Sequence, residues 1–453
     1  MNGGRDLKHF QVVDARPQTM IDTDVLVVGG GAAGLAAACT AARHGLRVTL
    51  IERYGFCGGA AVAGLSGTIC GLYLARPAAV GPPEKVVFGF VDRFIEAMNR
   101  RQGLTKPIRY GDTWTLVHDP VAWRESADDL LSSSGVQLLL HTLVTSVVMT
   151  EDKRVVGVWA HSKQGPLEIR AKVTIDASGD ADLFAMAGLP FTVGDKGRVQ
   201  NPTMIFRLGG VDVEKFLQSY GDDSILPADV TKAIVDANAS GQFRLPRAKV
   251  FLFPTPRSGQ LLCNSTRVVG RDGRELNTLI AKDFTEAEIE GRRQVREYER
   301  FYRSNLAGCE HAYVLDTGVQ VGVRQTRQIV GVSRLQNKDV VDAVKRSDAI
   351  ARSPWPIELH SGDKPRLSWL YEDVYEIPLG CFIPSEGEGI LAAGRCLSAE
   401  HEAMASARVT AQCFSYGHAV GHAAALAVKE SFEIREIKAS DVRDLLIRDG
   451  AEL

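Results

Sequence analysis

The stretch Asp22-Thr-Asp-Val-Leu-Val-Val-Gly-Gly-Gly-Ala-Ala-Gly-Leu35 decides the fold of this chain. Residues 25–28 are all apolar, which indicates a strand buried on both faces of a parallel sheet. Gly29, Gly31 and Gly34 follow with the spacing GxGxxG. The first glycine permits a tight turn, the second admits a pyrophosphate against the backbone, and the third lets the next helix pack on the strand. The stretch therefore predicts a strand, a phosphate-binding turn and a helix.

The residues after the glycines complete a dinucleotide-binding unit. Residues 35–44 are rich in alanine and end at Gly45, and residues 48–51 form a second apolar run that ends at Glu52. A carboxylate about 20 residues past the glycines accepts hydrogen bonds from ribose hydroxyls, and it would repel the 2′-phosphate of NADP. A glycine-rich turn that binds nothing is the alternative, and the complete context counts against it.

Length and composition narrow the class of protein. The 453 residues exceed the roughly 250–300 at which one core stops growing, so we expect two domains. A net charge of −2 predicts no general affinity for nucleic acid or anionic membranes. The sequence has no apolar run that could span a bilayer, and residues 1–20 have no signal-peptide core. We expect a cytoplasmic protein that acts on a small-molecule substrate, and homo-oligomers are left open.

Cysteine and histidine spacing gives no metal motif. The eight cysteines are scattered without a CxxC pair, which suits a reducing compartment and argues against a zinc ribbon or an iron–sulfur cluster. His418 and His422 are spaced to share one helix face, but no HExxH glutamate accompanies them. We therefore expect packing there and no metal site.

Residues 53–67 reveal a family resemblance. They are rich in Gly and Ala, which suggests backbone lying against an extended ligand. The GGGxxG run, the distal Glu52 and the following Gly58-Gly59 resemble the flavoprotein superfamily of glutathione reductase, fumarate reductase and glucose-inhibited division protein A. Within it, the chain looks most like the FAD-dependent oxidoreductases. The resemblance implies FAD as the bound dinucleotide, with NAD as the alternative.

Two later segments resemble the other FAD-contacting motifs of that superfamily. Asp176-Ala-Ser-Gly-Asp-Ala-Asp182 follows a strand at 172–175, where relatives place a turn beside the pyrophosphate; an Asx-rich turn is the alternative. Gly389-Ile-Leu-Ala-Ala-Gly-Arg-Cys-Leu-Ser398 precedes a small-residue helix at 407–428, whose N-terminus would face the flavin pyrimidine. A helix N-terminus stabilises an anion by about 0.3–2 kcal/mol, which suits reduced flavin. A buried Ala/Gly core helix is the alternative.

The resemblance also implies a set of cofactor-binding residues, including one on a strand that passes the adenine in relatives. They are Gly29, Gly31, Ala32, Ala33, Gly34, Glu52, Arg53, Gly58, Gly59, Ala60, Val144, Ala177, Ser178, Gly179, Gly394, Arg395, Ala405 and Ser406. Cys57 stands beside this set and could attach to the flavin methyl group, but a buried packing role is the expectation.

The predicted fold class is α/β, with a Rossmann-like, three-layer FAD-binding domain on a parallel sheet and an inserted α+β cap. The FAD-binding domain comprises residues 20–80, 115–200 and 375–430. Residues 81–114 form an excursion, 201–374 form the cap or substrate domain, and 431–453 form a C-terminal helical tail. Expected elements include a helix at 120–132 capped by Asp119, and a long charged helix at 285–307.

Candidate catalytic residues lie in segments expected near the flavin ring. His401 and Glu402 precede the flavin-facing helix, where His401 could relay a proton or merely bond a loop carbonyl. Arg324 and Arg327 lie in a segment that looks like a family signature; either could clamp a substrate carboxylate or form an internal ion pair. Weaker candidates with ordinary structural explanations are His118, Asp119, Arg207, His360 and Glu376.

The predicted activity is hydride transfer between a small organic substrate and flavin N5, as a dehydrogenase or reductase. A flavin monooxygenase or halogenase is one alternative, although Trp355-Pro-Ile-Glu-Leu is only a partial likeness to the halogenase signature. A tRNA-modifying flavoprotein is a second alternative, and the near-neutral charge counts against it. A non-catalytic flavin-binding protein is the third.

Overall fold

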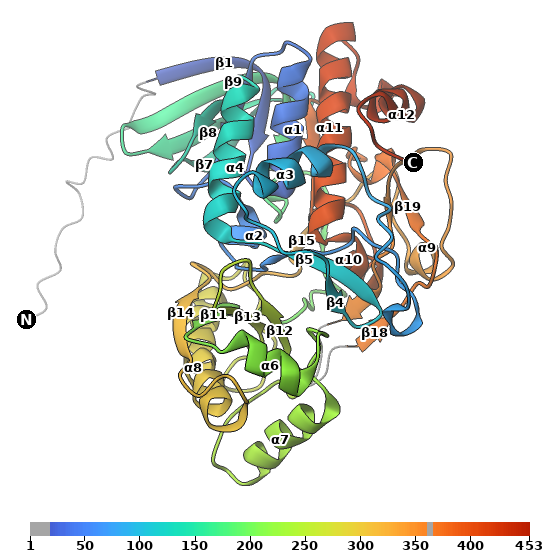
Figure 1. Cartoon of the computed structure of the whole chain (residues 1–453). Coiled ribbons are helices and arrows are strands. Elements are labelled where there is room, and N and C mark those ends of the chain that lie inside the picture. The colour runs from blue at the N-terminus through green and yellow to red at the C-terminus, as the bar shows by residue number, and fades with distance from the viewer. Residues whose placement is uncertain (1–18, 360–365) are drawn as a thin grey trace, which may run out of the picture.

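The fold is that of a computed structural model, which describes residues 19–359 and 366–453. The expectations for the first residues of the chain and for His360 lie outside those ranges. Figure 1 shows a larger α/β part, which contains the first strands and the last helices of the chain, and a smaller part built from its middle. This arrangement confirms the predicted α/β class with its parallel sheet.

The larger part is organised around a seven-stranded sheet with the order β6-β2-β1-β9-β8-β7, and β20 also pairs with β9. Its strands are β1 (Thr19–Val28), β2 (Val48–Ile51), β6 (Gln137–Leu139), β7 (Leu143–Met149), β8 (Val155–Ser162), β9 (Gly165–Asp176) and β20 (Ile390–Ala392). The pairs made by β1, β2, β6, β20 and the end of β9 are parallel, whereas β7, β8 and β9 form an antiparallel meander. Val28 lies beside both Ile51 and Asp176, so three loops meet at one edge of the sheet.

Small residues allow two helices to pack closely beside this sheet. Helices α1 (Ala32–Arg43) and α11 (Thr410–Glu430) run side by side in Figure 1. A Cβ at Gly417 would lie 2.0 Å from the backbone oxygen of Ala33, so only glycine fits at this crossing. The other helices of this part are α3 (Phe90–Asn99), α4 (Pro120–Ser133) and α12 (Ala439–Arg448).

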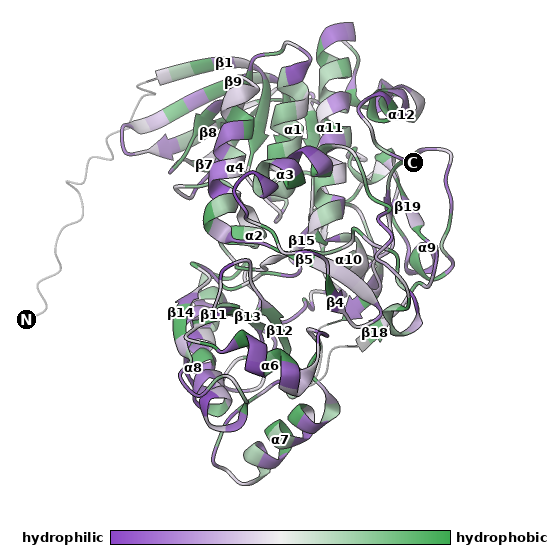
Figure 2. Cartoon of the chain, in the orientation of Figure 1, coloured by the Kyte–Doolittle hydropathy of each residue, from purple (hydrophilic) through white to green (hydrophobic). Residues whose placement is uncertain are grey.

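The smaller part has its own sheet and its own hydrophobic core. Its antiparallel sheet has the order β12-β13-β11-β14, from β11 (Phe206–Gly209), β12 (Phe251–Pro254), β13 (Leu261–Asn264) and β14 (Tyr313–Thr317). Helices α6 (Val213–Tyr220), α7 (Ala228–Ala239) and α8 (Ala281–Asn305) belong to this part. Figure 2 shows hydrophobic and hydrophilic segments alternating along α8, and its buried residues include Val295, Tyr298 and Tyr302 at helical spacing.

Short elements complete the fold. A three-stranded sheet contains β3 (Thr68–Ile69), β5 (Thr113–Val117) and β4 (Ile108–Tyr110). Two-stranded pairs are β10 (Phe191–Val193) with β15 (Arg327–Ile329), β16 (Ala349–Ser353) with β19 (Tyr375–Pro378), and β17 (Ile357–Leu359) with β18 (Arg366–Ser368). The short helices are α2 (Gly59–Val62), η1 (Pro77–Ala79), α5 (Asp182–Met186), α9 (Asn337–Val341), η2 (Leu379–Cys381), α10 (His401–Ala407) and η3 (Ile434–Glu436).

Three element predictions differ from the structure. The strand expected at 172–175 is the end of the longer strand β9 (Gly165–Asp176), because β9 pairs along its length with β1. The helix expected at 407–428 is α11, which begins later, at Thr410, because Val409 is extended (φ −76°, ψ 163°), and a separate short helix, α10, ends at Ala407. The long helix expected at 285–307 begins and ends earlier, at Ala281 and Asn305.

Candidate active site

A cavity of about 530 Å³ lies where the sheet edge of the larger part faces the strands of the smaller part. Most of the cofactor-binding residues expected from the sequence line it: Gly29, Gly31, Ala32, Ala33, Glu52, Arg53, Gly58, Gly59, Ala60, Val144, Ala177, Ser178, Gly179, Gly394 and Arg395. Gly34, Ala405 and Ser406 do not line it. The glycine turn, the Asp176 turn and the β20 segment are thus brought together, although they are more than 100 residues apart in the chain.

The glycine turn forms one wall of the cavity. A Cβ at Gly29 (φ +104°) would lie 2.5 Å from the Ala177 carbonyl oxygen, and one at Gly34 would lie 1.8 Å from the Gly29 carbonyl oxygen. Gly31 is different, because its backbone is extended and an added Cβ would meet nothing nearer than the Gly59 Cα at 3.7 Å. The protein itself therefore tolerates a side chain at Gly31, and the space beside it belongs to the cavity.

Helix α1 points its N-terminus at the same wall. Its N-cap residue is Gly31, so it has no capping side chain, and its first turn has no acidic residue. The first N–H groups of a helix have no partner within the helix, and the helix dipole favours an anion beside them. This combination of a glycine turn and a bare helix start is suited to a phosphate group.

Glu52 lines the cavity and is held by the backbone. Its Oε2 accepts a hydrogen bond from Gly30 N–H at 2.7 Å, and its Oε1 accepts one from Tyr54 N–H at 2.9 Å. The carboxylate therefore fixes the glycine turn, a role that the sequence did not suggest. Each oxygen has a further lone pair, so the carboxylate is still able to accept hydrogen bonds from ribose hydroxyls.

The Asp176 turn is built around a buried carboxyl group. Asp176 accepts hydrogen bonds from Ser178 N–H at 3.0 Å, from Ser178 Oγ–H at 2.6 Å and from Leu183 N–H at 2.9 Å. Burial raises the pKa of Asp176 to about 6, and the Ser178 hydrogen bonds oppose that shift. Asp176 thus shapes the turn, and Ala177, Ser178 and Gly179 present it to the cavity.

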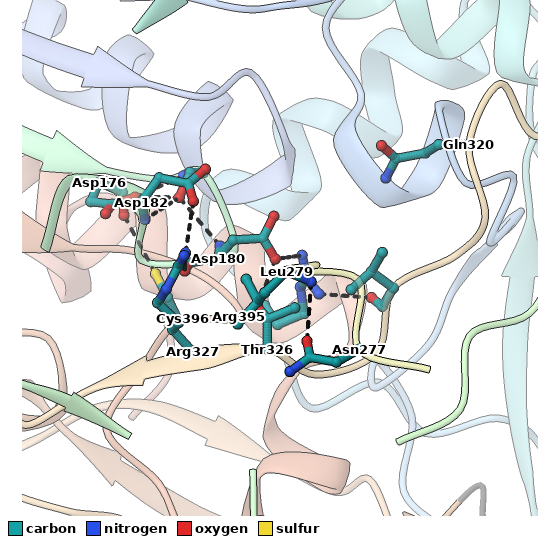
Figure 3. Close-up of polar contacts among 12 residues, drawn as sticks. Asp176, Asp180, Asp182, Asn277, Leu279, Gln320, Thr326, Arg327, Arg395 and Cys396 are labelled. Atoms are coloured by element: carbon teal, nitrogen blue, oxygen red, sulfur yellow. Dashed lines mark hydrogen bonds and ion pairs between the residues drawn. The ribbon is translucent and has the colours of Figure 1, made fainter. Parts of the chain in front are cut away.

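A network of charged residues braces this turn, as Figure 3 shows. Arg395 donates to Asp180 Oδ1 at 2.9 Å, and the Thr326 hydroxyl donates to the same oxygen at 2.6 Å. Arg327 donates to Asp182 Oδ1 at 3.0 Å and does not line the cavity. The structure therefore places Arg327 in an internal ion pair, which was the structural alternative for that residue.

Arg324 lines the cavity and is buried. Its Nη1 donates to the Asn201 carbonyl oxygen at 2.8 Å and also contacts the Thr203 hydroxyl. Burial, followed by repulsion from Arg408 and Arg247, holds the pKa of Arg324 well below its usual range. A buried arginine among other cations favours a site for a negatively charged group.

Helix α11, rather than α10, presents its N-terminus to the cavity. Val409, Thr410 and Cys413 line it, and α11 begins without a capping side chain or an acidic residue in its first turn. Ser406, in α10, instead donates to the Trp355 carbonyl oxygen at 2.6 Å. The predicted helix N-terminus at the cavity is thus present, but it starts at Thr410.

His401 and Glu402 lie at the start of α10 and do not line the cavity. His401 is partly buried, and that burial lowers its pKa, while the charge of nearby Asp195 opposes the shift. The structure therefore keeps His401 and Glu402 apart from the residues that line the cavity.

The weaker candidates take structural positions. His118 is buried against Trp123, with ring centroids 4.5 Å apart. Asp119 caps α4 by accepting from Val121 N–H at 2.8 Å, and Arg207 pairs with Asp316. Glu376 accepts from Arg346 N–H at 2.6 Å.

Sequence reasoning missed several polar residues that line the cavity, notably Tyr110, Glu358 and Arg408. The Tyr110 hydroxyl donates to Glu358 Oε1 at 2.8 Å, and both side chains are buried. Burial, then the charge of Glu358, raises the pKa of Tyr110 well above its usual value. Arg408 precedes α11 and was hidden within the predicted small-residue helix, and Glu358 stands in the segment that begins at Trp355.

Two further groups lie apart from this wall. The Cys57 thiol does not line the cavity; it is buried behind Gly30, whose added Cβ would lie 2.6 Å from its Sγ. Among the described residues, His418, His422 and Asp449 bring one ligand atom each within 4.8 Å of one another. Asp449 also pairs with Arg43 at 2.9 Å.

No helix in the described ranges has the length and apolar character to cross a bilayer.

A glycine turn, a helix start without a capping side chain and a carboxylate at the end of β2, all on a parallel sheet, define a dinucleotide-binding α/β fold. The chain belongs to the family described as FAD dependent oxidoreductase, which matches residues 24–446. This match confirms the resemblance expected from the sequence, and the cofactor of the chain is FAD.

Individual relatives are more distant. The chain is 29% identical to thiamine thiazole synthase from Aeropyrum pernix over 169 residues, which are 35% of this chain and 54% of that protein. The chain thus spans about half the length of this curated relative. A geranylgeranyl bacteriochlorophyll reductase-like protein from Thermoplasma acidophilum is 15% identical, with 96% of this chain and 93% of that chain covered and a TM-score of 0.49. p-Nitrophenol 4-monooxygenase from Pseudomonas putida is 13% identical, with 95% of this chain and 86% of that chain covered and a TM-score of 0.48.

The residues of the cavity fit FAD. The open space beside Gly31 and the unpartnered start of α1 suit its pyrophosphate, and Glu52 suits its ribose. The second bare helix start, at Thr410, suits the negative charge that reduced flavin carries on its pyrimidine side.

Proposed function

We propose that this protein transfers a hydride between a small organic substrate and N5 of FAD. The observation that carries the proposal is a single cavity with two kinds of wall. One wall consists of the dinucleotide-contacting segments, and the other holds a buried tyrosine–carboxylate pair, Tyr110 and Glu358. Bound FAD would supply the redox chemistry, and the chain would supply binding, orientation and proton handling.

The residues of the chain divide these tasks. The N-terminus of α1 and Gly31 hold the pyrophosphate, Glu52 holds the ribose, and the N-terminus of α11 faces the flavin pyrimidine. The raised pKa of Tyr110 keeps its hydroxyl protonated, and turning that one O–H from Glu358 toward a substrate would make it a hydrogen-bond donor or proton donor there. Glu358 accepts its hydrogen bond and orients it.

We propose that the reaction takes place in the cytoplasm. The eight cysteines are free thiols and seven of them are buried, which suits a reducing compartment.

An anaerobic substrate screen tests the proposed function. Purified holoprotein is mixed with alcohols, amines, organic acids and enones while the flavin absorbance is followed. We expect one class to bleach the oxidised flavin, or to reoxidise flavin that has been reduced chemically. A flavin that dithionite reduces but that no substrate class reduces or reoxidises would contradict the proposal.

A further inference from the structure

A cluster of polar residues, buried except for the half-buried Arg408, lines or backs the cavity beside the smaller part. It consists of Tyr110, Arg247, Arg324, Trp355, Glu358 and Arg408. Five of these residues lie outside the dinucleotide-contacting segments, and Arg408 lies just before helix α11, whose N-terminus faces the same cavity. Within the cluster, the three arginines carry three positive charges against the one negative charge of Glu358. The cluster therefore has an excess of positive charge, in a place where water screens charge poorly.

Of the arginines that line the cavity, the two in this cluster, Arg324 and Arg408, form no ion pair within the part of the chain that the structure describes. Arg395, at the dinucleotide wall, is paired with Asp180 at 2.9 Å. Among the residues that the structure describes, neither Arg324 nor Arg408 forms an ion pair; Arg324 donates to the neutral Asn201 carbonyl oxygen, and Arg408 donates to Gln200 Oε1 at 3.3 Å. A buried cation is costly unless it is paired, so these two residues favour an anion from outside the chain.

The unsatisfied atoms of the cluster are hydrogen-bond donors. Arg408 Nε, Trp355 Nε1 and Arg247 Nη2 are all buried without a partner among the described residues. Trp355 is 1% exposed and lines the cavity. Because buried donors in native proteins are nearly always paired, this set matches a ligand that brings acceptor oxygens.

Aromatic and apolar side chains surround the donors. The Tyr110 ring lies 5.3 Å from the Trp355 ring and 5.8 Å from the Phe253 ring, measured between centroids. Phe253 and Ile205 also line the cavity. An inorganic anion would leave these surfaces unused, whereas an organic anion would bury its apolar body against them.

From these observations we infer that the substrate is a small organic carboxylate, whose carboxylate binds Arg408 and Arg324 and whose apolar body lies against Tyr110 and Phe253. The inference rests on the proposed function for the identity of this cavity as the substrate site. A planar guanidinium is suited to this ligand because it can donate two parallel hydrogen bonds to one carboxylate.

Binding of a matched pair of probes to the holoprotein tests the inference. Benzoate and benzamide have the same shape, and only benzoate is charged at pH 7. Titration calorimetry and the perturbation of the flavin spectrum both report binding without turnover. We expect benzoate to bind about 10- to 100-fold more tightly than benzamide, the range of a hydrogen bond to a charged group. Equal affinities, or no binding of benzoate, would overturn the inference.

Variants assign the binding to the cluster. Arg408→Gln should weaken benzoate binding about 10- to 100-fold and leave benzamide unchanged. Arg408→Lys should give a smaller loss, because it keeps the charge without the planar fork. Arg296→Gln, which removes a surface arginine of α8, is the matched control. Wild-type benzoate affinity in a folded, flavin-bound Arg408→Gln protein would overturn the inference. So would an Arg408→Gln protein that loses its flavin but keeps its affinity for benzoate.

Glu358→Gln provides a test of opposite sign. It removes the one acid of the cluster and keeps an acceptor for the Tyr110 hydroxyl, so benzoate should bind more tightly. Unchanged or weaker binding would count against the inference, even where Arg408→Gln does not fold. The two proposals fail separately: flavin that no substrate reduces would end the proposed function, whereas reduction by neutral substrates with no carboxylate binding would end only the inference.

Discussion

At the scale of single residues, the hydroxyl of Tyr110 is the group best placed to handle a proton. It lines the cavity, donates to Glu358 at 2.8 Å, and is kept protonated by burial. Tyr110→Phe should retain its flavin and lose about 10²- to 10⁴-fold in the rate of flavin reduction, the range of a positioned acid or base. Anaerobic rapid mixing with the substrate found by the screen measures this rate. An unchanged rate would assign Tyr110 to packing.

His401 offers the contrasting case. The sequence placed it before the flavin-facing helix, but it lies at the start of α10, outside the cavity lining. His401→Ala should therefore reduce its flavin at close to the wild-type rate under the same rapid-mixing conditions. A large loss of rate with intact flavin content would restore the acid–base role that the sequence suggested.

His118 links one buried ring to the pH dependence of stability. Neither ring nitrogen has a partner among the described residues, and burial lowers the pKa of His118 to about 3. The unfolded chain binds a proton at about 6.5, so the folded state loses stability as the pH falls below that value, until the pH reaches about 3. The loss at pH 5 is about 2 kcal/mol.

His118→Leu should remove that dependence. Between pH 7 and pH 5 the wild type should lose about 2 kcal/mol of unfolding free energy that the variant does not lose. Urea denaturation at both pH values measures it, and the same change at the exposed His161 is the matched control. Parallel pH profiles for His118→Leu and wild type would show that this ring does not govern acid stability.

At the scale of elements, local chemistry decided which predictions succeeded. The helix expected at 120–132 is α4 at Pro120–Ser133, because Asp119 caps it and Pro120 fits its first turn. The break between α10 and α11 could not be predicted, because the Ala-rich sequence on both sides is compatible with one continuous helix. Likewise, pairing with β1 made one strand of β9, and pairing is not visible in local sequence.

The N-terminus of α11 gives a prediction at this scale. Thr410→Asp would place a carboxylate at a helix start that has no acidic residue and faces the cavity. That charge would favour the helix by about 0.3–1 kcal/mol but oppose negative charge on the reduced flavin. We expect a more negative flavin reduction potential in Thr410→Asp than in the isosteric, uncharged Thr410→Asn. Dye equilibration compares the two, and equal potentials would contradict the placement of the flavin pyrimidine.

At the scale of the whole molecule, the two walls of the cavity differ in how far sequence reveals them. The dinucleotide wall could be predicted because each of its segments carries its own glycine signature after a strand. The opposite wall joins Tyr110, Arg324, Glu358 and Arg408, which are scattered along the chain. Arg324 was a candidate from the sequence, whereas Tyr110, Glu358 and Arg408 are ordinary residues in their local context. Only the packing of the smaller part on the larger one brings the four together.

The two parts of the molecule also have separate large hydrophobic cores, one beside the seven-stranded sheet and one within the smaller part. A further hydrophobic cluster, which includes Tyr110, Phe253 and Trp355, lines the cavity itself. Gly31 is the position where the contents of the cavity can be tested, because its backbone accepts a side chain and an added Cβ meets no close protein atom.

The FAD content of purified wild-type and Gly31→Val proteins tests the central claim most directly. A valine at this position reaches into the space assigned to the pyrophosphate. We expect about one FAD per chain in the wild type and almost none in the variant, with the two proteins giving the same circular dichroism. Full FAD occupancy in a folded Gly31→Val protein would contradict the placement of the cofactor in this cavity.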